Sequence, residues 1–102
     1  MNAILADRSE DLQALCSQYH VERLELFGSA VGDTFDPERS DFDFLVRFEP
    51  SSPEDHADRY FGLLAALQDL LERNVDLVES TAIRNPFFLR SVESSRTLIY
   101  GT

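Results

Sequence analysis

The chain has 102 residues and a formal net charge of −10, which is enough length for one domain with one hydrophobic core. All nine basic residues are Arg, and the acidic excess argues against non-specific binding of DNA or RNA. No apolar run reaches the length of a membrane span, and the first ten residues lack the pattern of a secretory signal. We therefore expect a soluble, cytoplasmic protein that does not bind a membrane.

The first predicted element is a helix over residues 7–18. Asp7 and Glu10 have the spacing of a capping box at its start. Apolar side chains then recur with the period of a helix, at Leu12, Leu15, Cys16 and Tyr19. Cys16 is the single cysteine, so no internal disulfide can form, and we interpret it as a small core residue.

Two strands are predicted next, over residues 23–27 and 41–48. Gly28-Ser29 ends the first strand, and Ser29 is placed to cap a short helix. A polar segment over residues 32–40 leads to the second strand. There Phe42 and Phe44 alternate with polar residues, so we expect both rings on the buried face.

A long helix is predicted to begin at Pro53, with Ser52 as its N-cap. Gly62 inside this helix costs about 1 kcal/mol relative to Ala, which indicates a close packing contact there. The residues expected to face the core are Tyr60, Leu64, Leu67 and Leu71.

The last predicted elements are a strand over residues 75–79, a helix opened by Asn85-Pro86, and a short strand over residues 98–100. Strands and helices interleave along the chain. We therefore predict an α/β (α+β) fold, a small mixed β-sheet packed with helices, in a single domain over residues 1–102.

Three aspartates carry the candidate chemistry. Asp41 and Asp43 are two residues apart in a predicted strand, so their side chains project from the same face. Asp76 lies in the otherwise apolar strand over residues 75–79, where an unpaired charge would be costly. If the two strands are neighbours, Asp76 stands beside the first two acids. Three carboxylates would then form the all-oxygen site that Mg²⁺ prefers.

The Gly28-Ser29 turn supplies backbone N–H groups and a hydroxyl that can meet a phosphate. Most Gly-Ser pairs are plain turns, and acidic pairs at strand starts are often solvated. The signal is the order: a strand, Gly-Ser, a polar loop, Asp-x-Asp, and a later strand aspartate. His20 and His56 have no Cys or acidic residue at ligand spacing in the sequence, so we assign them no metal role.

These motifs resemble the nucleotidyltransferases of the DNA polymerase β superfamily, most closely the stand-alone minimal nucleotidyltransferase (MNT) proteins. The resemblance covers nearly the whole chain from Val21 onward. It rests on four stretches, Leu-Phe-Gly-Ser at 26–29, Ser-Asp-Phe-Asp-Phe-Leu-Val at 40–46, Val-Asp-Leu-Val at 75–78 and Asn-Pro-Phe-Phe at 85–88. The last stretch is similar to the ending of MNT proteins partnered with HEPN-domain toxins.

The resemblance implies a polymerase β palm-like core and a catalytic site. By this analogy Asp41, Asp43 and Asp76 hold two Mg²⁺ ions, and Gly28 and Ser29 bind the phosphates of ATP. The nucleotide passes to an acceptor hydroxyl and pyrophosphate leaves.

The resemblance also implies a partner. The larger relatives add a helical domain that shapes the acceptor pocket, and no such domain is present in this sequence. A HEPN-type RNase toxin whose tyrosine receives AMP would complete the site, making the chain the antitoxin of a type VII-like toxin–antitoxin pair in a hetero-oligomer. Two alternatives stay open: an antitoxin that neutralises its toxin by binding alone, and a small-molecule nucleotidyltransferase.

Overall fold

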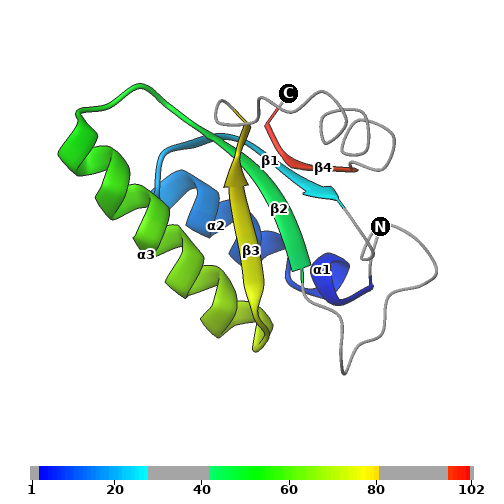
Figure 1. The fold of residues 1–102 in the computed structure, drawn as a ribbon. Helices are drawn as coiled ribbons and strands as arrows, with labels where there is room; N and C mark the ends of the chain where they lie inside the picture. The colour runs from blue at the N-terminus through cyan, green and yellow to red at the C-terminus, as the bar shows by residue number, and fades with distance from the viewer. Residues whose placement is uncertain (1–2, 28–41, 81–96, 102) are drawn as a thin grey trace, which may run out of the picture.

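The computed structural model describes residues 3–27, 42–80 and 97–101 (Figure 1). Its elements are α1 (Ala3–Asp7), α2 (Ser9–Gln18), β1 (Val21–Phe27), β2 (Phe42–Phe48), α3 (Pro53–Leu71), β3 (Val75–Glu79) and β4 (Thr97–Tyr100). The four strands form one sheet in the order β3-β2-β1-β4. β2 and β3 run parallel, whereas β1 is antiparallel to both β2 and β4. The predicted mixed sheet packed with helices is therefore confirmed.

The helices lie on one face of this sheet, and the main core fills the space between them (Figure 1). Phe42 and Phe44 are both fully buried on that face, as their alternation predicts, and their rings stack 6.1 Å apart. The helices contribute six buried side chains to the same cluster: Leu5, Leu12, Cys16, Leu63, Leu67 and Leu71. Burial raises the pKa of the Cys16 thiol to about 12, so it stays protonated and inert. Its predicted role as a core residue is confirmed.

A smaller apolar cluster lies on the opposite face of the sheet. It consists of Phe27, Leu45 and the partly buried Val78, one from each of three adjacent strands. Because successive side chains in a strand point to opposite faces, these residues share their face with Asp43 and Asp76. We call this the acidic face of the sheet.

The predicted start of the first helix, at residue 7, is wrong. The structure has two helices where the sequence suggested one over residues 7–18, and the chain breaks between them at Arg8. Asp7 is the last residue of α1, and Arg8 precedes α2 with no side-chain cap hydrogen bond, so there is no capping box. The reason is tertiary: α1 brings Leu5 into the core, and burial of that side chain outweighs local capping.

The long helix α3 begins as predicted. Ser52 is the N-cap, its hydroxyl oxygen accepts a hydrogen bond from the Asp55 amide at 3.2 Å, and Pro53 opens the first turn. The predicted core stripe is correct for Leu67 and Leu71. The centre of the stripe is shifted, because Leu63 is fully buried whereas Tyr60 and Leu64 pack at its margins.

Gly62 has the close contact that its presence in a helix suggested. A Cβ atom at this position would lie 2.5 Å from Cε1 of Tyr19, at the end of α2. We expect Gly62→Ala to destabilise the protein by about 1–3 kcal/mol, because the ring must shift in a packed contact. In a Tyr19→Ala background the same change should instead stabilise by up to about 1 kcal/mol, the helix propensity of Ala over Gly. Denaturant unfolding of the four proteins in this cycle tests the reversal of sign, and additive changes would contradict the contact.

The remaining predicted elements fall into two groups. The strand over residues 75–79 is confirmed, and those predicted over 23–27 and 98–100 each begin earlier, at Val21 and Thr97. The short helix after Ser29 and the helix opened by Asn85-Pro86 lie outside the described residues. None of the helices in residues 3–27, 42–80 and 97–101 combines the length and the hydropathy that a membrane-spanning helix needs.

Candidate functional site

The acidic face carries two aspartates on neighbouring strands. β2 and β3 are adjacent and parallel, and their register pairs Asp43 directly with Asp76. Neighbouring strands lie about 4.8 Å apart, so the two carboxylates leave the sheet side by side. Asp43 also lies opposite Phe27 in the antiparallel ladder, which gives one row across three strands, Phe27, Asp43 and Asp76. The sequence placed these acids 33 residues apart, and the parallel crossover through α3 brings them together.

The two carboxylates differ in their surroundings. Asp43 is half-buried, and Phe27 and Leu45 of the smaller apolar cluster lie beside it on the same face. Asp76 is exposed, on the strand that forms the edge of the described sheet. A ligand could therefore reach Asp76 from solvent while one side of the pair is bounded by apolar side chains.

Tyr60 fixes the backbone beside Asp76. Its hydroxyl donates a hydrogen bond to the carbonyl oxygen of Leu77 at 2.5 Å and so ties α3 to β3 one residue after the acid. Burial raises the pKa of Tyr60, and the negative charges of Glu79 and Asp76 add to this effect. The phenol therefore stays protonated and keeps donating this bond throughout the physiological pH range.

The donor set suits a hard divalent cation. Two adjacent carboxylates offer only oxygen ligands, which Mg²⁺ uses together with waters and substrate phosphates. Across residues 3–27, 42–80 and 97–101, no group of three His, Cys, Asp or Glu side chains could hold a metal ion. The third predicted ligand, Asp41, and the predicted phosphate-binding pair Gly28 and Ser29 lie outside these ranges. The described pair thus fits part of a metal site.

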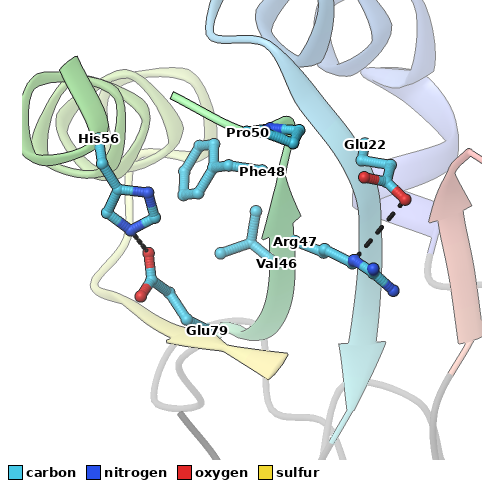
Figure 2. A pocket seen from close by; sticks show the side chains of 7 residues that line it. All are labelled: Glu22, Val46, Arg47, Phe48, Pro50, His56 and Glu79. Atoms are coloured by element: carbon cyan, nitrogen blue, oxygen red, sulfur yellow. Dashed lines mark ion pairs between the residues drawn. The ribbon is translucent and has the colours of Figure 1, made fainter. Parts of the chain in front are cut away.

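A hollow of about 190 Å³ lies at the C-terminal ends of β2 and β3, whereas the aspartate pair lies near their N-terminal ends (Figure 2). Val46 and Phe48 of β2 lie between two ion pairs, Arg47 with Glu22 and His56 with Glu79. Phe48 is five residues along β2 from Asp43, roughly 16 Å in an extended strand. The hollow is therefore separate from the aspartate pair.

Two histidine contacts were not expected from sequence. His56 in α3 pairs with Glu79 at the end of β3 and also meets the Phe48 ring edge-on, at a centroid distance of 5.4 Å. His20 lies 3.7 Å from the Glu49 carboxylate. Both partners are more than 20 residues away in the chain, so no local spacing signals them. Each contact joins the ends of two elements, and neither adds a ligand beside Asp43 or Asp76.

Comparisons with known proteins agree with this geometry. The model of the nucleotidyltransferase domain family matches residues 9–99. Over 86 residues the chain is 38% identical to "Putative protein adenylyltransferase MJ0128" of Methanocaldococcus jannaschii, covering 84% of this chain and 82% of that protein.

Solved structures share the fold. One described as a "putative minimal nucleotidyltransferase" matches with a TM-score of 0.66 and 30% identity, over 91% of this chain and 90% of that one. A tri-AMPylated Shewanella oneidensis HEPN toxin in complex with its MNT antitoxin contains a chain that matches with a TM-score of 0.66 and 18% identity, over 95% and 72%. At that identity the second likeness concerns the fold alone. The family match over most of the chain settles the assignment: this chain belongs to the nucleotidyltransferase domain family and is a nucleotidyltransferase enzyme.

Proposed function

We propose that the chain transfers AMP from ATP to a hydroxyl group of a partner protein, in a Mg²⁺-dependent reaction. The observation that carries the proposal is the register of Asp43 with Asp76 across two parallel strands. The relative from Methanocaldococcus jannaschii, whose name is "Putative protein adenylyltransferase MJ0128", supports AMP as the transferred group and a protein as the acceptor.

In the proposed reaction the acceptor oxygen attacks the α-phosphorus of ATP. The new oxygen–phosphorus bond forms as the bond to pyrophosphate breaks. Asp76 accepts the hydroxyl proton, a role that suits the more exposed of the two described acids. Gly28 and Ser29 would hold the β- and γ-phosphates through backbone N–H groups and a hydroxyl.

Asp41, Asp43 and Asp76 would hold two Mg²⁺ ions. When bound, the ions supply charge neutralisation at the attacking and leaving oxygens. Three carboxylates and an ATP of about −4 sum to roughly −7, and two Mg²⁺ ions offset +4 of it. Without cations this site would repel its substrate.

The proposed acceptor is a tyrosine of a HEPN-type RNase toxin, with the chain acting as its antitoxin in a cytoplasmic hetero-oligomer. A chain in the complex of a tri-AMPylated Shewanella oneidensis HEPN toxin with its MNT antitoxin shares this fold, which supports such a partner. The net charge of −10 suits a partner whose RNA-binding surface is basic. An alternative is neutralisation by binding alone. It is favoured by Ala30, Val31 and Gly32, which follow Gly-Ser where the family that this sequence resembles often carries an Arg.

The decisive experiment pairs this chain with a HEPN-domain protein, the proposed partner. The purified pair is incubated with α-labelled ATP and Mg²⁺, and the native chain is compared with Asp41→Asn/Asp43→Asn. Label on the partner with the native chain only is the expected result. RNase neutralisation that persists in the double variant without any label would instead establish binding alone. When a small-molecule alcohol is added, label on that molecule and none on the partner would establish a small-molecule nucleotidyltransferase.

A further inference from the structure

The outer surface of α3 is unusual for a solvated helix. Every fourth residue along this surface is exposed. These residues are Pro53, Ala57, Phe61, Ala65 and Asp69. Phe61 is the most exposed large apolar side chain in the described part of the protein, with 65% of its surface accessible. The small side chains of Ala57 and Ala65 leave its ring standing above the helix. We call Glu54, Ala57, Asp58, Phe61, Ala65 and Asp69 the α3 outer surface.

The Phe61 ring is held in place before anything binds. It packs edge-on against Tyr60, with a centroid distance of 5.1 Å and an interplanar angle of 90°. Tyr60 is itself fixed by its hydrogen bond to the Leu77 carbonyl oxygen. An anchor that is already ordered loses less conformational entropy on binding, and aromatic anchors of this kind dominate protein interfaces.

The charge around the anchor is acidic. α3 contains four acids, Glu54, Asp55, Asp58 and Asp69, against a single Arg. That residue, Arg59, donates a hydrogen bond to the Glu49 carbonyl oxygen at 3.3 Å, at the N-terminal end of the helix. Asp58 and Glu54 lie next to Phe61 and Ala57 at helical spacing, so the apolar row is bordered by negative charge.

The negative charge of the α3 outer surface indicates which kind of partner could bind there. A second copy of the chain would bring two acidic helices together, which is electrostatically unfavourable. Nucleic acids and anionic membranes are repelled for the same reason. A protein with a basic face and an apolar recess has both complementary features. We propose that the α3 outer surface is the docking site for such a basic protein, with Phe61 as the anchor.

The docking site and the aspartate pair use different faces. α3 covers one face of the sheet, whereas Asp43 and Asp76 project from the other. A partner bound through Phe61 therefore leaves the acidic face open to ATP. To serve as the acceptor, it must extend around β3, the edge strand of the described sheet, and bring its hydroxyl to the aspartates. The inference rests on the proposed function only in naming the partner, which would be the HEPN protein.

The test measures the dissociation constant of the full chain for that HEPN protein. Phe61→Ala should weaken binding on the order of tenfold or more. Leu98→Ala is the matched control, because Leu98 is also a large apolar side chain exposed on the described surface, at 43%, but lies on β4. It should change binding less than about twofold. Both side chains are exposed, so unfolding midpoints should remain close to native.

Charge is tested with a second matched pair. Glu54→Gln/Asp58→Asn should weaken binding several-fold at low ionic strength and reduce its salt dependence. The control Glu10→Gln/Asp11→Asn removes two exposed acids from α2 and should leave both quantities unchanged. Native-like binding by Phe61→Ala, or equal losses in test and control variants, would overturn the docking site, as would the absence of binding by the native chain.

The docking site and the proposed function can fail separately. Label transfer by a native chain whose binding ignores Phe61 would leave the transferase standing and remove the docking site. Binding that depends on Phe61 without label transfer would do the reverse. Asp43→Asn should bind like the native chain.

Discussion

Asp76→Asn is expected to lower the rate of nucleotide transfer by at least about 10²- to 10³-fold, the range for loss of one preorganised electrostatic group. Asparagine keeps the size of the side chain but removes the charge that would hold a cation and accept the acceptor proton. The side chain is exposed on an edge strand, so the fold should not depend on it. Single-turnover transfer of label from ATP to the partner protein measures the effect.

The same substitution should lower the transfer rate without lowering the stability of the fold. Without metal, removing one of two adjacent carboxylates relieves a repulsion that solvent screens to about 1 kcal/mol or less. Its unfolding midpoint should therefore equal or exceed that of the native chain. Saturating Mg²⁺ should raise the midpoint of the native chain but not that of Asp76→Asn, because only a ligand that binds the folded state stabilises it.

The control is Asp11→Asn, which removes an exposed acid from the first turn of α2. It should transfer label and respond to Mg²⁺ like the native chain. Undiminished transfer by Asp76→Asn would show that this carboxylate is dispensable for the reaction and would remove the basis of the proposed mechanism.

Local chemistry was predictable from sequence where a residue satisfies a need of its own backbone. Ser52 and Pro53 mark the start of α3 because an N-cap and a first-turn proline depend only on their immediate neighbours. Alternation in β2 likewise placed Phe42 and Phe44 inside. Asp76 stood out as an acid in an apolar strand, but the structure leaves it exposed, so the cost of a buried charge that singled it out does not apply.

Tertiary relations were not predictable in the same way. The pairing of Asp43 with Asp76 depends on the register of a parallel crossover, which no residue of either strand encodes alone. The end of α3 was also hidden, since Glu72 takes a left-handed conformation, φ 55°, where glycine would have been the usual signal. The break at Arg8 follows from burial of Leu5, a contact with distant residues.

Phe44→Ala should be the most destabilising single truncation of β2, at about 3–5 kcal/mol. The ring is fully buried, stacks on Phe42, and lies between Leu26 and Leu77 in the register of its two neighbouring strands. Its removal leaves a cavity at the centre of the sheet that rigid neighbours cannot fill. For a domain of about 100 residues this corresponds to a fall in the unfolding midpoint of at least about 12 °C.

Two comparisons separate packing from chemistry in that result. Phe61→Ala removes the same atoms from an exposed position and should change the free energy of unfolding by less than about 0.5 kcal/mol. Phe44→Leu should recover part of the loss, because it restores apolar volume without the ring. Phe44 also flanks Asp43 on β2, so the truncation should lower transfer activity on warming, in parallel with unfolding, whereas Asp76→Asn lowers it at every temperature. Equal losses of stability at positions 44 and 61 would contradict the inference that burial of Phe44 stabilises the sheet that carries the two aspartates.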